Sequence, residues 1–141
     1  MIRRFARPIH LVVAWLFVVG LLYQVFLAGL GVFDSSAAFI THRDTGYGLT
    51  LVPVVLAVTA FAGRFGRWQV AAALVMLVQF ILQSVLVFQR DAVPAIAALH
   101  PVNGFVILLI AIWLATDAWR RFQAGDEPEP AEESRSEAPA G

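Results

Sequence analysis

Two of the three histidines in this 141-residue chain occur in the same local pattern. Each begins a His-x-x-x-Gly-aromatic segment, one with His42 and Gly46 and the other with His100 and Gly104. Two neutral imidazoles that face each other can bind the iron of a haem from both sides. The chain contains no cysteine, so any bound metal must rely on histidine or carboxylate ligands.

The composition indicates which kind of element positions these histidines. Hydrophobic residues make up 60% of the chain and charged residues only 14%, whereas soluble domains average about 45–50% and about 25%. So little charge cannot cover a soluble domain, and the chain is expected to lie in a lipid bilayer. Apolar segments near the length of about 20 residues that crosses a bilayer predict transmembrane helices at about residues 10–33, 43–63, 68–89 and 100–119. We therefore expect an all-α membrane protein, with residues 1–123 forming a four-transmembrane-helix bundle.

The charged residues between and beyond these helices predict the orientation. Arginines gather on one side of the predicted bundle, at positions 3, 4, 7, 64, 67, 120 and 121, whereas Arg43 and Arg90 lie on the other side. By the positive-inside rule, both termini are expected in the cytoplasm. Residues 124–141 contain six acidic residues and one arginine, which predicts a disordered acidic cytoplasmic tail. The formal net charge of zero argues against a nucleic-acid partner.

The chain also shows an internal repeat. A shift of 55 residues places Gln24 over Gln79 and, after a three-residue difference in loop length, His42 over His100. The first helix of each hairpin runs in the same direction, so the two helix hairpins are expected to form parallel repeats about a pseudo-two-fold axis along the membrane normal. The two histidines then lie at equal depth on opposite sides of this axis, near the outer face. This arrangement predicts one haem b with bis-histidine ligation.

Other candidate cofactor-binding residues surround the predicted haem. Gly46 and Gly104 lie one helical turn beyond the histidines, where a side chain would meet the porphyrin ring. Arg43 and Arg90 lie on the same side of the membrane and are suited to pair with the haem propionates, because a guanidinium binds a carboxylate through two hydrogen bonds.

The remaining polar residues within the predicted helices allow more than one interpretation. The amides of Gln24, Gln79 and Gln83 could form hydrogen bonds between helices, or they could orient a haem edge or a quinone carbonyl. Of these, Gln24 and Gln79 are the predicted cofactor-binding residues. His10 lies near the cytoplasmic end and is interpreted as an interfacial histidine or as a quinone or proton contact. Zinc is the alternative to haem at the histidine pair, with further ligands among the aspartates at positions 34, 44 and 91.

Two strings of residues resemble a known family. They are Gln24-Val-Phe-Leu-Ala-Gly-Leu-Gly-Val, followed by His42-Arg-Asp-Thr-Gly, and Ala97-Ala-Leu-His-Pro-Val-Asn-Gly-Phe-Val-Ile-Leu-Leu. Over roughly residues 10–118 the chain resembles one four-helix haem-binding half of the haem A synthase family. That resemblance implies that His42 and His100 are axial haem ligands and that Gln24 matches a glutamine of the family's odd-numbered helices. The chain is also similar to an uncharacterised family of small four-helix bacterial membrane proteins, which implies a multi-pass protein of the bacterial cytoplasmic membrane.

These observations lead to three functional expectations. The first is a b-type haem protein for electron transfer or haem handling, rather than a stand-alone enzyme. The haem A synthase family has eight helices and two histidine pairs, whereas this chain has one pair and is expected to hold one haem. A quinone, another membrane redox protein or a second copy of the chain is the expected partner. The alternatives are a cofactor-free accessory or assembly subunit of a membrane complex and a haem-modifying enzyme of haem A synthase type.

Overall fold

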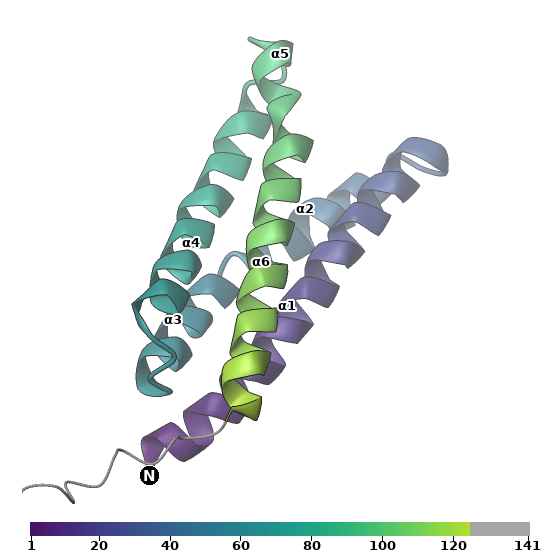
Figure 1. Ribbon diagram of the computed structural model, residues 1–141. Helices are drawn as coiled ribbons and strands as arrows, with labels where there is room; N and C mark the ends of the chain where they lie inside the picture. Colours follow the sequence, from purple (N-terminus) through teal and green to yellow (C-terminus); the bar gives the residue numbers. More distant parts are fainter. Residues whose placement is uncertain (125–141) are drawn as a thin grey trace, which may run out of the picture.

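The computed structural model describes residues 1–124, and within them it is helical, with no strand. The helices are α1 (Ile2–Phe33), α2 (Ala38–Leu49), α3 (Val52–Ala62), α4 (Arg67–Phe88), α5 (Pro94–Ala97) and α6 (Leu99–Gln123). Four segments are long and apolar enough to span a membrane, with α2 and α3 forming the second and α5 and α6 the fourth (Figure 1). The predictions of an all-helical fold and of four segments able to span a membrane are confirmed for the described residues. The predicted acidic tail, apart from Ala124, lies outside the described residues.

Each long helix directs one stripe of small and apolar residues inward. In α1 the buried positions follow the spacing of an α-helix, with Ala14, Phe17, Val18 and Leu21 on one face. The opposite face is also apolar but exposed, as expected for a helix surrounded by lipid. Buried alanines such as Ala111 let neighbouring helices approach closely, which is how membrane helices pack.

The second spanning segment is broken near its middle. Helix α2 ends at Leu49 and α3 begins at Val52, directly before Pro53. Proline has no N–H to donate, and its ring clashes with the carbonyl four residues earlier, so the helix breaks here. The chain continues through short turns in which Thr50 N–H donates to the carbonyls of Gly46 and Tyr47. The break separates the half that carries His42 from the half that packs in the core.

Three of the helix bounds differ by four residues or more from those expected from the sequence. Helix α1 begins at Ile2 rather than near residue 10, α2 begins at Ala38 rather than near residue 43, and α6 ends at Gln123 rather than near residue 119. The sequence does not predict the short helix α5. The extra turns of α1 contain three arginines and Pro8, which lies inside the helix although it has no N–H to donate. Early in α2, Phe39 packs against Gly31 of α1, where an added Cβ would lie 2.7 Å from the phenyl ring.

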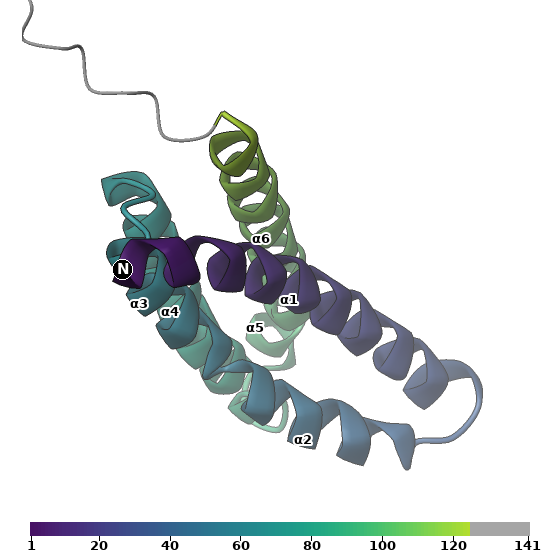
Figure 2. The same ribbon diagram turned by 90° about the horizontal axis from the view of Figure 1, so that it is seen from below.

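The two ends of the bundle differ in packing. At the terminal end, where α1 begins, α6 ends and residues 63–66 join α3 to α4, the helices pack in the ring α1–α3–α4–α6. At the cavity end, where residues 34–37 and 89–93 form the connections, no Cα atom of α2 lies within 8 Å of one in α4 or α6. Helix α2 has no buried residue. Figures 1 and 2 show α1 and α2 leaning away from α4 and α6 at this end.

Candidate functional site

A cavity of about 480 Å³ lies between the two hairpins at the cavity end. This volume is within the range of about 300–1,000 Å³ typical of small-molecule and cofactor sites. Side chains of α1, α2, α4 and α6 line it, and most of them are apolar. The residues that line the cavity include Gln24, His42, Arg43, Gly46, Gln83, His100 and Gly104.

His42 of α2 and His100 of α6 meet across this cavity, as the sequence pattern predicts. Their ring centroids are 6.1 Å apart and the ring planes are inclined by 63°. In zinc sites the metal lies about 2.0–2.1 Å from the imidazole nitrogen and the ring centroid roughly 1.1 Å further, so two imidazoles on opposite sides of one metal have centroids about 6 Å apart. The observed separation therefore suits one metal atom between the two rings.

Both imidazoles are oriented by a backbone carbonyl. His42 Nδ1 lies 3.0 Å from the carbonyl oxygen of Gln24, and His100 Nδ1 lies 3.2 Å from that of Gln83. A carbonyl oxygen can only accept, and an unprotonated Nδ1 would face it with two lone pairs in repulsion, so Nδ1 carries the proton. In the neutral tautomer Nε2 then keeps its lone pair for a metal. Ligating histidines usually donate their other N–H in this way.

The two glycines of the repeated pattern lie on the wall of the cavity. A Cβ added at Gly46 would lie 3.5 Å from the Gln24 side chain, and one added at Gly104 would lie 3.4 Å from the Gln83 side chain. These are ordinary van der Waals distances, so packing within the protein does not itself require glycine at either position. Glycine here leaves cavity space open one helical turn beyond each histidine.

The other predicted site residues divide into those that line the cavity and those that do not. Gln24 and Arg43 line it, whereas Gln79 and Arg90 do not. Arg43 Nε donates to the carboxylate of Asp44 at 2.8 Å, and its side chain is well exposed. Arg90 Nε lies 3.5 Å from the Asp91 carboxylate, next to it in the α4–α5 connection. The two arginines are therefore not equivalent in the structure.

The sequence indicates Gln83 as one of three candidate cofactor-orienting glutamines but does not favour it over Gln79, and it does not indicate Asn103. Gln83, rather than Gln79, supplies the carbonyl that holds His100, and its side chain accepts a hydrogen bond from Asn103. The sequence does not select Gln83, because Gln79 and Gln83 both begin a Gln-x-x-Leu pattern like that of Gln24. In the structure, Leu27 and Leu86 are buried, whereas Leu82 is exposed.

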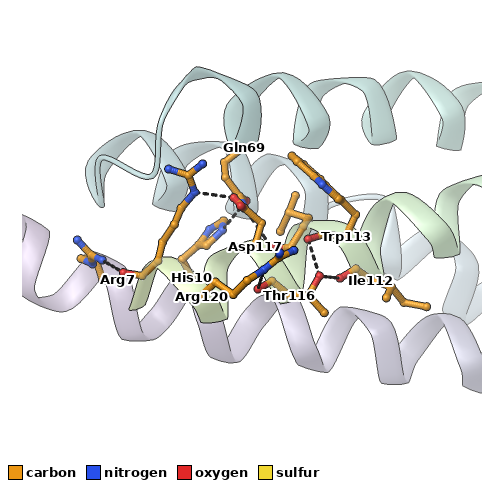
Figure 3. Close-up of polar contacts among 10 residues, drawn as sticks. Arg7, His10, Gln69, Ile112, Trp113, Thr116, Asp117 and Arg120 are labelled. Atoms are coloured by element: carbon orange, nitrogen blue, oxygen red, sulfur yellow. Dashed lines mark hydrogen bonds and ion pairs between the residues drawn. The ribbon is translucent and has the colours of Figure 1, made fainter. Parts of the chain in front are cut away.

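The terminal end contains the third histidine in a different setting. His10 is fully buried, with Nδ1 2.9 Å from Thr59 Oγ1 and Nε2 3.2 Å from Gln69 Oε1. Gln69 Nε2 donates to Asp117 at 2.8 Å, and Arg121 Nε donates to the same carboxylate. Figure 3 shows Gln69 between His10 and Asp117. Both ring nitrogens of His10 are occupied, so this histidine acts as an interhelical contact.

The described residues contain no larger cluster of metal-ligating side chains than the histidine pair. Among those residues, no set of three or more histidines, cysteines or acidic residues lies close enough to hold one ion. A structural zinc site takes four protein ligands and a catalytic one three. The geometry thus offers two imidazoles, which match the two axial positions of a haem iron.

Comparison with known proteins yields one match. Residues 24–90 match the model of a family of unknown function, DUF6220. The matched region covers just under half of the chain and includes Gln24, His42 and Gln83, and it ends before His100. No curated protein and no solved structure matches the chain. The resemblance to the haem A synthase family stays a prediction.

Proposed function

We propose that this protein is a membrane-embedded b-type haem protein that holds one haem b between His42 and His100. The observation that carries the proposal is the pair of imidazoles 6.1 Å apart across a cavity, each with Nδ1 at a backbone carbonyl. A bound haem supplies reversible one-electron chemistry. The chain's own residues provide axial ligands, an apolar enclosure and, through Arg43, a cation beside the cavity.

The proposed orientation follows from the distribution of charge. The seven arginines at positions 3, 4, 7, 64, 67, 120 and 121 belong to the terminal end, which we assign to the cytoplasm. The cavity end then faces the outer side, with the chain in a bacterial cytoplasmic membrane. The similar way in which Gln24 and Gln83 hold the two histidines supports the proposed origin from two parallel helix-hairpin repeats.

Electron transfer or haem handling is the role that suits a single haem at one end of the bundle. One haem near one face gives no path for electrons across the whole bilayer within one copy. A quinone, another membrane redox protein or a second copy of the chain is therefore the proposed partner. Haem modification of the haem A synthase type and a cofactor-free accessory role are alternatives that the experiment below separates from this proposal.

The test is a visible spectrum of the detergent-purified protein in its oxidised and dithionite-reduced forms. We expect a sharp low-spin α-band in the wild-type protein and its loss in both His42→Ala and His100→Ala, because each substitution removes one axial ligand. A colourless wild-type protein, even after reconstitution with haem b, would favour the cofactor-free role and overturn the proposal. A low-spin haem that persists in His100→Ala would refute the ligand assignment. Mass analysis of the extracted porphyrin detects a modified haem.

A further inference from the structure

We infer that Gln24 with Thr45, and Gln83 with Asn103, are positioning pairs that hold the two axial histidines for the haem. This inference rests on the proposed haem-binding function and adds residues that the His-x-x-x-Gly pattern does not contain. In each half, the residue three positions after the histidine contacts the glutamine whose carbonyl that histidine binds.

The pair on α4 and α6 is the more deeply buried. Asn103 is 7% exposed, and its Nδ2 donates to the Gln79 carbonyl at 3.0 Å and to Gln83 Oε1 at 2.8 Å. These two bonds fix the first turns of α6 against the helical turn of α4 that ends at Gln83. The carbonyl of Gln83 is then held where His100 Nδ1 reaches it, at 3.2 Å.

The pair on α1 and α2 has the same arrangement. The Gln24 amide satisfies its neighbours when its nitrogen faces the His42 carbonyl oxygen at 2.8 Å and its oxygen faces the Gly46 N–H at 3.3 Å and the Thr45 hydroxyl. The amide nitrogen then also lies 3.1 Å from His42 Nδ1. Because Nδ1 donates to the Gln24 carbonyl, the amide N–H is directed at the His42 carbonyl. The side chain thus lies against the helical turn from His42 to Gly46. The backbone carbonyl of Gln24 accepts from His42 Nδ1 at 3.0 Å. Helix α2 has no buried residue, and these polar contacts connect it to α1 together with the packing of Phe39 on Gly31.

The expected consequence is a change in how the imidazoles bind iron, with the ligands themselves still present. A partner that fixes the tautomer and ring orientation of a ligating histidine typically changes metal affinity by about 10–100-fold when it is removed. Thr45→Val and Asn103→Leu keep nearly the same volume and remove the hydrogen-bonding groups. We expect each to accelerate haem loss by about 10-fold and to shift the haem midpoint potential and the low-spin electron paramagnetic resonance signal.

Two controls separate positioning from general damage to the fold. Thr45→Ser keeps the hydroxyl and is expected to restore the wild-type rate of haem loss and the wild-type potential. Thr116→Val removes a hydroxyl from α6 that bonds only to the carbonyls of Ile112 and Trp113 on its own helix (Figure 3). It is expected to behave like the wild-type protein. Thr45 is less deeply buried than Asn103, so Thr45→Val tests the inference even where Asn103→Leu does not fold.

The outcomes distinguish this inference from the proposed function. One outcome is that the wild-type protein binds haem through both histidines while Thr45→Val and Asn103→Leu keep its rate of haem loss, its potential and its resonance signal. In that case the positioning role is wrong, and the proposed haem binding is unaffected. If Thr45→Ser is as impaired as Thr45→Val, the hydroxyl is not the group that matters, and the inference fails for that half. If the wild-type protein binds no haem, the proposed function itself is wrong.

Discussion

Both ends of this bundle contain histidine, but the two ends differ in how many ring nitrogens of each histidine have a hydrogen-bond partner. At the terminal end, His10 is fully buried and both of its ring nitrogens have partners on other helices. At the cavity end, His42 and His100 are half-buried, and each has a carbonyl at Nδ1 only. A polar group within a membrane domain is costly unless it is paired. Both nitrogens of His10 are bonded within the protein, whereas His42 and His100 share a cavity in which we propose that a ligand binds.

The helices also pack more closely at the terminal end than at the cavity end. Around His10 the four helices close into a ring, and the ring of Phe65 lies 4.5 Å from the imidazole. Around His42 and His100 the helices diverge, and α2 approaches α6 only through side chains. The closed end is packed around His10, and the open end contains the cavity in which we propose that haem binds. The predictions below test this division of roles.

The largest expected effect is a loss of stability on breaking the network at the terminal end. Gln69→Leu removes the groups that bind His10, the Leu114 carbonyl and Asp117. It leaves buried polar atoms without partners, each costing about 1–3 kcal/mol in soluble proteins and less in membrane helices, so we expect a loss of about 2 kcal/mol. The measurement is reversible unfolding in mixed detergent micelles. Haem affinity of the folded fraction should stay within about two-fold of wild type, because no ligand changes.

Gln79→Leu is the matched control for this experiment. It makes the same chemical change on the same helix, but within residues 1–124 the Gln79 side chain has no hydrogen bond, and only its backbone carbonyl accepts one, from Asn103. We expect little change in the free energy of unfolding. If both variants lose the same stability, the His10 network is not what holds the terminal end together.

A smaller effect is expected from filling the cavity at its glycines. Gly46→Ala and Gly104→Ala add a methyl group at ordinary contact distance from Gln24 and Gln83, so the haem-free protein should fold normally. Alanine is favoured over glycine in a helix by about 1 kcal/mol, so thermal stability should not fall. Haem affinity should fall by about 10-fold, because the methyl group occupies space beside the porphyrin, and overfilling a packed site costs about 1–3 kcal/mol. Haem titration and melting of the haem-free protein measure the two effects.

Gly48→Ala makes the same substitution two residues further along α2. No atom lies within 4 Å of an added Cβ there, and Gly48 does not line the cavity. Its haem affinity should equal that of the wild type. Equal affinities in all three variants would show that the haem does not lie against these glycines.

The sequence predicts the features that depend on a single segment of the chain better than those that depend on contacts between helices. Four apolar segments predict four spans because helix length and bilayer thickness are matched within each segment. The proximity of His42 and His100 was also predictable, since the repeated pattern places each at the same end of its helix. The break before Pro53 is consistent with the missing proline N–H, but a proline does not by itself predict a break, because Pro8 lies inside the continuous helix α1.

The features that sequence reasoning missed are contacts between helices. Gln79 and Gln83 are one helical turn apart on the same face of α4, so periodicity does not distinguish them. Only the contact with Asn103 and the bond from His100 select Gln83 as the counterpart of Gln24. The network around His10 was missed for the same reason, because its members come from α1, α3, α4 and α6.

The smallest expected effect distinguishes the two arginines of the cavity end. Arg43 lines the cavity and Arg90 does not, so only Arg43 is placed to pair with a haem propionate. Arg43 is exposed and already paired with Asp44, so Arg43→Gln should weaken haem binding by only about two- to five-fold, within the range for exposed ion pairs. Arg90→Gln should have no measurable effect. Haem dimethyl ester lacks the propionate charges, and with it Arg43→Gln should bind as tightly as the wild-type protein. An equal loss with haem and with the ester would mean that Arg43 acts by packing, and that charge pairing with the propionates has no part in holding the haem.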